Sequence, residues 1–362
     1  MKTRRIKTIL LFLSTMPFIG IYAQSIYYVS PHASSGGDGS PATPFHIIHE
    51  AVEKARKDKN CTTIYLREGE YILDTPLVLT SADGNDSKEL IIRNYPGEKA
   101  IISSGITLDL KWEKYKNGIM RAAVKGNPVM DMLIVNGDLR SMARYPDYDK
   151  TAVRFNGTSA LATAPERVKK WKNPEGGYFH AMHSHDWGDF HYRITGKNEK
   201  GELQLEGGWQ NNRPMGIHPE NRMVENIFEE LDAPGEWYYD KQEGWLYYYP
   251  LSDENINELV FETPQLKNLI EIAGTSSHPV KNITIEGIEL TQTIRTFMEH
   301  YEPLLRSDWT IYRGGAVIFR GTEKCTLRDC YIHHVGGNGV FFDKYNRNSA
   351  VTGSYLTSIG AS

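Results

Sequence analysis

The C-terminal part of the chain repeats itself, and this constrains the fold more than any other feature of the sequence. Three segments of equal length align without gaps: residues 282–290, 324–332 and 348–356. The first two are offset by 42 residues and the last two by 24. A short period of β-rich pieces with Gly or Asp at the corners is typical of one coil of a parallel β-solenoid. The repeat therefore predicts stacked coils, with a loop accounting for the longer offset.

The repeat also predicts which side chains face the core, because residues alternate between the two faces of a strand. The inward positions of the three segments are apolar or small: Ile283, Ile285, Ile288 and Leu290; Cys325, Leu327, Cys330 and Ile332; Ser349, Val351, Ser354 and Leu356. Cys325 and Cys330 are then small core residues rather than partners in a disulfide or a metal site.

A second strand is repeated at residues 316–320 and 339–343. Its expected stacked pairs are Val317 on Val340 and Phe319 on Phe342 inside, and Arg320 beside Asp343 outside. After the third corner the sequence runs through residues 357–362 and stops, without the strand that follows the second corner. Natural solenoids cover their ends with a polar cap. We therefore expect an interrupted or fragmentary reading frame.

The N-terminus has the pattern of a secretory signal over residues 1–23. A basic start, an apolar stretch at residues 9–21 and the small Ala23 before Gln24 form this pattern. Pro17 and the short apolar length disfavour a membrane anchor. A net charge of −4 without a basic stripe argues against nucleic acid as a partner. We expect a protein exported to the periplasm or beyond.

Residues 24–126 are expected to form an N-terminal cap and the first coils. An amphipathic helix at residues 45–57 has an apolar face made of Ile47, Ile48, Ala51, Val52 and Ala55. A strand is expected at residues 26–30. The motif at residues 27–31, the Gly-rich loop after it, this helix and residues 64–71 resemble the N-terminal start of secreted right-handed parallel β-helix proteins that act on polysaccharides.

Residues 127–263 interrupt the repeat with alternating strands, Gly turns and dense aromatics, which predict an inserted β-rich subdomain. Incomplete coils follow at residues 264–362. This order resembles glycoside hydrolase family 141, a β-helix family with α-L-fucosidase and xylanase activities. The resemblance implies an all-β, right-handed parallel β-helix with an N-terminal helical cap, a carbohydrate polymer or oligosaccharide as partner, and no cofactor.

Candidate binding residues come from two places. Residues 180–193 hold a cluster in which His183, His185 and His191 would share the face of a strand. The spacing matches no standard zinc pattern, so we favour a sugar-contacting surface. The candidates from this region are His183, His185, Asp186, Trp187 and Trp209. Those from the coils are His333 and His334, at a corner beside Gly336 and Gly337, and the ion pair of Arg320 and Asp343, which more often has a structural role.

Hydrolysis of a glycosidic bond uses two carboxyl groups that flank the sugar. No such pair stands on the coils that the repeat defines, so we expect the catalytic carboxylates beyond Ser362. The function expected for the intact parent is glycoside hydrolysis of a complex polysaccharide. Two alternatives are a β-helix polysaccharide lyase, disfavoured because no Asp-rich calcium cluster stands on those coils, and a carbohydrate-binding fragment without activity.

Overall fold

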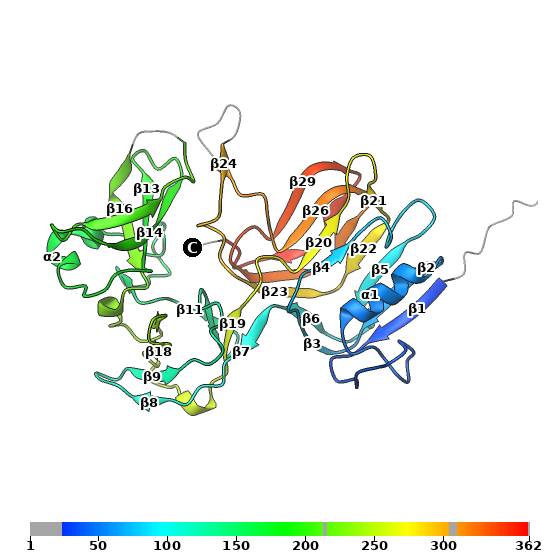
Figure 1. The fold of residues 1–362 in the computed structure, drawn as a ribbon, viewed down its shortest axis with the longest axis horizontal. Helices are drawn as coiled ribbons and strands as arrows, with labels where there is room; N and C mark the ends of the chain where they lie inside the picture. Colours follow the sequence, from blue (N-terminus) through cyan, green and yellow to red (C-terminus); the bar gives the residue numbers. More distant parts are fainter. Residues whose placement is uncertain (1–23, 213–215, 304–309, 361–362) are drawn as a thin grey trace, which may run out of the picture.

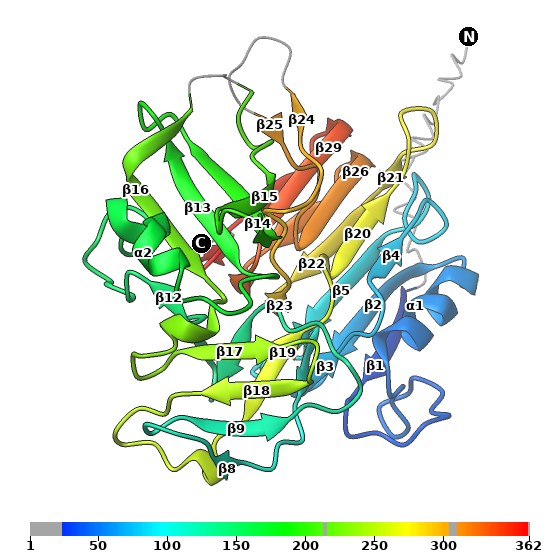
Figure 2. The same ribbon diagram turned by 60° about the vertical axis from the view of Figure 1, so that its left-hand side comes forward.

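The computed structural model describes residues 24–212, 216–303 and 310–360. The expected signal at residues 1–23 lies outside these ranges. The described chain is mostly β, with short helices, and it divides into two parts that lie side by side (Figures 1 and 2). One part consists of stacked parallel strands, which we call the coils. The other is a set of antiparallel sheets, which we call the insert because it lies between two strands of the coils.

The coils contain three parallel sheets. Sheet 1 has the order β1 (Gln24–Val29), β2 (Cys61–Leu66), β5 (Leu90–Asn94), β22 (Ile283–Glu286), β27 (Thr326–Arg328) and β30 (Ala350–Thr352). Sheet 2 has the order β3 (Gly69–Ile72), β6 (Ala100–Ser103), β23 (Glu289–Thr293), β28 (Tyr331–Val335) and β31 (Tyr355–Leu356). Sheet 3 joins β4 (Leu77–Leu79), β20 (Ile270–Ala273), β26 (Val317–Glu323) and β29 (Val340–Arg347), and β21 (Val280–Lys281) also pairs with β26. On each pass the chain visits the sheets in this order.

The registers confirm the alignment read from the sequence. Ile285 pairs with Leu327, which pairs with Val351, so the offsets of 42 and 24 residues are those of stacked strands. In sheet 2 the corresponding series is Leu290, Ile332 and Leu356. In sheet 3 the expected pairs are all present: Val317 with Val340, Phe319 with Phe342, and Arg320 with Asp343.

The interior of the coils is one apolar core. The inward residues of the first two aligned segments are at most 2% exposed. Those of the third segment are half-buried, because β30 and β31 are edge strands of the described sheets. Cys325 and Cys330 are buried in this core, and all three described cysteines are free. The prediction that the two cysteines are core residues is confirmed.

Helix α1 (Ile48–Lys57) packs against the first strands of the coils. Its buried face consists of Ile48, Ala51, Val52 and Ala55, which join the same core as Val29 and Leu66. The helix begins later than expected, and Ile47 is extended and 46% exposed rather than part of the apolar face. The reason lies in Phe45, whose backbone is bonded to Tyr28 and Ser30 and is therefore held extended.

The insert leaves the coils after β6 and returns before β20. One sheet has the order β11 (Asp138–Arg140), β10 (Leu133–Val135), β19 (Phe261–Pro264) and β7 (Gly105–Thr107). A second has the order β12 (Arg144–Tyr145), β16 (Ile217–Glu225), β13 (Tyr178–His183), β14 (Asp189–Lys197) and β15 (Leu203–Gly207). A third has the order β17 (Trp237–Asp240), β18 (Trp245–Tyr248), β9 (Met120–Ala123) and β8 (Glu113–Lys114). All these pairs are antiparallel.

Short elements complete the structure. The insert contains α2 (Pro165–Val168) and the 3-10 helices η1 (Ala160–Thr163), η2 (Phe228–Glu230) and η3 (Ile256–Glu258). The small hairpin of β24 (Glu302–Pro303) and β25 (Thr310–Ile311) extends from the loop between β23 and β26. This loop reaches the insert: Phe297 accepts a hydrogen bond from the side chain of Gln210 at 2.8 Å.

Candidate active site

A cavity of about 660 Å³ lies where the insert meets the coils. Most of its lining comes from the insert, and the coils contribute Arg295, His334, Val335, Ser358, Ile359 and Gly360. Five carboxylic residues line it: Asp131, Asp138, Asp147, Glu225 and Glu236. Pockets of this size are typical of small-molecule sites in proteins. The cavity therefore brings acidic groups of the insert against a wall of the coils.

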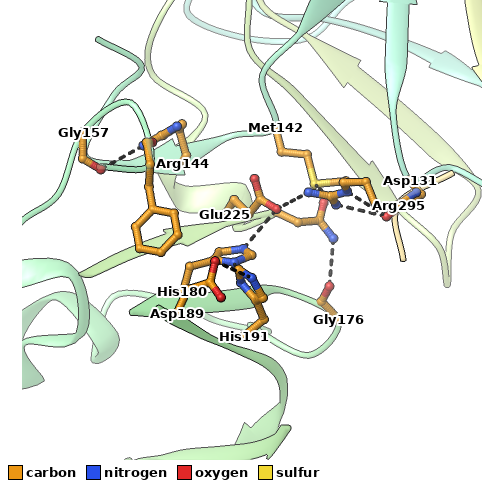
Figure 3. Close-up of polar contacts among 12 residues, drawn as sticks. Asp131, Met142, Arg144, Gly157, Gly176, His180, Asp189, His191, Glu225 and Arg295 are labelled. Atoms are coloured by element: carbon orange, nitrogen blue, oxygen red, sulfur yellow. Dashed lines mark hydrogen bonds and ion pairs between the residues drawn. The ribbon is translucent and has the colours of Figure 1, made fainter. Parts of the chain in front are cut away.

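Arg295 joins the two parts across the cavity (Figure 3). It follows β23 and donates to Asp131 from Nη2 at 3.0 Å, and its Nη1 donates to Glu225. Its guanidinium also lies over the rings of Phe297 and Tyr178, at 4.8 and 5.2 Å. Burial alone would lower the pKa of Arg295, but the two carboxylates outweigh burial and raise it. Arg295 is a fixed positive charge at the junction.

A close backbone approach positions Arg295. Gly336, at the corner after β28, faces the backbone of Ile294 and Arg295, and a Cβ added to it would lie 2.4 Å from the Arg295 nitrogen. Its N–H donates to Thr293 at 3.0 Å. The absence of a side chain at Gly336 therefore lets the backbone of Arg295 approach closely.

Glu225 ends β16 and is 9% exposed. Burial alone would raise its pKa, but Arg295 and His180 outweigh burial and hold the pKa of Glu225 below its usual range. The contact to His180 joins Nε2 and Oε1 at 3.2 Å. Glu225 is therefore an ionised carboxylate at neutral pH.

Glu236 behaves in the opposite way. It is 2% exposed, and among the described residues its carboxyl accepts only long hydrogen bonds, from the backbone N–H groups of Arg144, Asp232 and Ala233 at 3.3, 3.4 and 3.3 Å. Burial, with a smaller contribution from the charges of Asp147 and Asp232, raises the pKa of Glu236 to about 8. Glu236 therefore carries a proton at neutral pH.

Arg144 links these two carboxyl groups. Its backbone N–H donates to Glu236, and its Cα is paired with that of Glu225 across β12 and β16. Its side chain is occupied by backbone oxygens, those of Pro146, Phe155 and Gly157, at 2.7 to 3.0 Å. Both carboxyl groups line the same cavity, and two carboxyl groups of one site whose pKa values are shifted in opposite directions are the pattern by which acid and base roles are divided in enzymes.

A pair of imidazoles lies behind Glu225 (Figure 3). His180 and His191 are cross-strand partners in β13 and β14, and their Nδ1 atoms are 2.6 Å apart. His191 Nε2 lies 3.3 Å from Asp189, whose side chain is 43% exposed. Burial lowers the pKa of His180 to about 4, so its ring is neutral at pH 7.

The structure corrects one geometric prediction for the histidine cluster. His183, His185 and His191 do not share the face of one strand, because the chain turns between β13 and β14. Asp186 and Gly188 adopt positive φ at this turn, 57° and 106°. His185 and Asp186 are exposed there. Trp187 is 45% exposed and stacks on buried His183, with ring centroids 5.6 Å apart.

The other predicted site residues lie apart from one another. Trp209 is half-buried, and its indole N–H donates to the backbone oxygen of Glu299 at 2.7 Å. Arg320 and Asp343 form the expected ion pair at 2.9 Å on sheet 3, where Arg313 also binds Asp343 and Glu271 binds Arg320. These two residues are not among those that line the cavity.

The two corner histidines differ in position. His334 lines the cavity, and burial lowers its pKa. His333 binds Glu289 at 3.0 Å and stacks on Tyr331. Of the nine residues named from the sequence, His334 is the one found in the cavity wall.

Sequence reasoning missed Glu225, Glu236, His180 as a cavity residue, and Arg295. One local signal was present: Glu236 stands directly before the aromatic strand β17, an unusual neighbourhood for a carboxyl group, because Glu is rarely buried without a partner. The pairing of Arg295 with Glu225 spans 70 residues and has no local signal. Within the described residues, no three His, Cys, Asp or Glu side chains are arranged to hold a metal ion, and no helix among them is long and apolar enough to cross a membrane.

Comparisons with known proteins bear on the fold. No family model matches the sequence. The uncharacterized Bacillus subtilis protein YwoF is 34% identical over 88 residues, which cover 24% of this chain and 17% of that protein. A solved structure of a glycoside hydrolase is similar with a TM-score of 0.70 and 20% identity, covering 87% of this chain and 63% of the other. This chain thus spans less than two thirds of both relatives. A structure of XylC with xylose is more distant, with a TM-score of 0.43 and 14% identity, covering 87% of this chain and 41% of the other. The first solved structure shows that the β-rich fold also occurs in a glycoside hydrolase.

Proposed function

We propose that this chain hydrolyses glycosidic bonds at the cavity between the insert and the coils. The observation that carries the proposal is the pair of carboxyl groups near Arg144, of which Glu236 is protonated at neutral pH and Glu225 is ionised. A glycoside hydrolase needs one carboxylic acid to protonate the leaving oxygen and one carboxylate on the sugar's other side. The similarity in fold to a solved glycoside hydrolase supports the same class of reaction.

In the proposed mechanism Glu236 gives its proton to the glycosidic oxygen as the bond from that oxygen to the anomeric carbon breaks. The ionised Glu225 stabilises the positive charge that develops on the sugar ring, and Arg295 and His180 keep it ionised. A water molecule then adds to the anomeric carbon. Its proton goes to Asp147, an exposed carboxylate that also lines the cavity.

The finer features of the proposal follow the sequence resemblance. The fold is a right-handed parallel β-helix with a sequence-based division into an N-terminal cap and first coils at residues 24–126, an inserted β-rich subdomain at 127–263 and further coils at 264–362, and the protein is exported. The substrate is a complex polysaccharide of the fucoside or xylan type. Trp187, stacked on His183 beside His185 and Asp186, stays a predicted aromatic contact for a sugar outside the cavity. Trp209, Arg320, His333 and Asp343 stay as predicted substrate contacts, and His334 contacts sugar within the cavity.

The test uses the purified chain with fucosides and xylan, and release of reducing sugar as the measure. We expect turnover by the wild type and a loss of at least about 100-fold in kcat in Glu236→Gln, since a general acid contributes this much. Asp109→Asn is the matched control. Asp109 is an exposed carboxylate of the insert, and Lys125 is its ion-pair partner among the described residues. Equal kcat values for Glu236→Gln and the wild type would contradict the proposal.

Two further outcomes decide between the alternatives. Products with the ultraviolet absorbance of an unsaturated uronate would identify a lyase. Sugar binding without turnover would identify a carbohydrate-binding chain and would agree with the expectation that the catalytic carboxylates lie beyond Ser362. Turnover that depends on Glu236 would instead locate the acid within this chain.

A further inference from the structure

Four ionisable side chains form an unbroken line from the surface of the insert into the cavity. Asp189 is followed by His191, His180 and Glu225, with contacts of 3.3, 2.6 and 3.2 Å. Only the outer end is open: Asp189 is 43% exposed, whereas the side chains of His191 and His180 are 5% and 2% exposed. Figure 3 shows the two rings between the two carboxyl groups.

The donor and acceptor at each contact along this line can be assigned by starting from the carboxylates at its two ends. An ionised carboxylate only accepts, so His180 Nε2 must donate to Glu225. The neutral His180 ring then accepts at Nδ1, and His191 must donate from its own Nδ1. His191 Nε2 faces Asp189. Burial alone would raise the pKa of Asp189, but the hydrogen bond to His191 and the charge of His191 outweigh burial and lower it. Asp189 is therefore an acceptor too, and His191 carries protons on both nitrogens.

The charges around the two rings favour this arrangement. Glu225 faces His180 on one side and is itself bound by Arg295, which also binds Asp131. Tyr178 and Phe297 flank His180, and Phe297 and Phe155 flank His191. Arg144, on β12, interacts electrostatically with Glu225. Burial and, to a smaller extent, the charge of Asp189 raise the pKa of Tyr301. Apart from His191, the positive charges named here lie at the Glu225 end, so Asp189 is what stabilises a charged His191.

We propose that His180 and His191 form a proton relay between Asp189 at the surface and Glu225 in the cavity, which couples the ionisation of Glu225 to the charge of His191. In the relay step the Nε2 proton of His180 moves to Glu225 while the Nδ1 proton of His191 moves to His180 Nδ1. The number of protons is unchanged: Glu225 becomes neutral, and His191 changes from imidazolium to imidazole. The reverse shift restores the ionised carboxylate. The geometry carries this inference without the proposed function, and only its kinetic consequence depends on that function.

Nitrogen NMR of the full chain with labelled histidines tests the relay directly, because imidazole nitrogens report their protonation. We expect His180 to be neutral with its proton on Nε2 at pH 7, and His191 to be doubly protonated. Asp189→Asn keeps both rings and removes only the outer charge. In this variant we expect the Nε2 signal of His191 to change, because Nε2 then faces a neutral amide instead of a carboxylate.

His191→Phe interrupts the relay, and His278→Phe is the control because His278 is exposed on a turn of the coils. If the chain hydrolyses glycosides, the acidic limb of its pH profile should move upward by about 1 unit in His191→Phe and stay in place in His278→Phe, because Glu225 loses a neighbouring positive charge. A neutral His191 at pH 7, or an Asp189→Asn variant with unchanged His180 and His191 signals, would overturn the relay. Absence of glycosidase activity with the expected NMR result would refute only the function.

Discussion

The coils and the junction with the insert bury different kinds of side chain. In the coils, stacked strands place the same apolar column on each pass, as in Ile285, Leu327 and Val351. At the junction, Asp131, Glu225 and Arg295 form an ion network in which the side chains are 10% to 16% exposed. The first arrangement follows from a local repeat. The second depends on groups brought together from distant parts of the chain, so the two should respond differently to substitution.

The largest effect is expected from Arg295→Ala. Removing one partner of a buried ion pair leaves uncompensated charge and costs about 3–5 kcal/mol, and here both Asp131 and Glu225 lose their partner. The free energy of unfolding from urea titration measures this. The matched control is Arg328→Ala on the coils, whose pair with Glu286 is half-exposed and is worth about 1 kcal/mol or less. Equal losses in the two variants would show that the junction network is no more important than a surface pair.

Ile285→Ala tests the core of the coils. Ile285 is fully buried, and truncation of a buried Ile costs about 2–5 kcal/mol through lost burial and the cavity left behind. Val351, in the same column but on the edge strand, is half-buried. We expect Val351→Ala to cost less than half as much in the same urea titration. A larger loss at Val351 would contradict the assignment of the core to the inner strands.

Glu236→Gln separates the polar cavity from the apolar core by its dependence on pH. The folded-state pKa of Glu236 is raised from 4.5 to about 8. The folded chain therefore holds a proton that the unfolded chain releases, and the wild type loses stability as pH rises from about 4.5 to about 8. A shift of this size corresponds to at most about 5 kcal/mol, and we expect about 2 kcal/mol because the cavity admits water.

The glutamine variant does not titrate. It should match the wild type near pH 4 and be more stable at pH 9, as measured by urea titration at both values. The control Asp109→Asn removes an exposed carboxylate and should show no such difference. A stability difference between Glu236→Gln and the wild type that is the same at both pH values would show that Glu236 is not held neutral by burial.

The difference between the coils and the junction explains which features could be predicted from the sequence. The period of the coils determines register, inward faces and the stacking of Phe319 on Phe342, because each coil repeats the same local pattern. The turn that separates His183 from His191 was missed because the alternation of side chains along a strand was extended through residues at which the chain turns back. The pairing of Asp131 with Arg295 joins residues 164 positions apart. No pattern within a strand predicts such a contact, so the candidate site required the three-dimensional arrangement.

The smallest effect is expected where a residue is replaced by the one that occupies the equivalent position in the next coil. Cys330 Sγ lies 3.3 Å from the backbone oxygen of Arg328, and one coil later Ser354 Oγ lies 3.1 Å from that of Thr352. The position thus already accepts a hydroxyl with the same partner. We expect Cys330→Ser to cost about 1 kcal/mol or less in urea titration, since the buried hydroxyl has its acceptor. Cys330→Ala removes that contact and leaves a small cavity, so it serves as the matched comparison. A serine variant much less stable than the alanine variant would show that the two coils are not equivalent at this column.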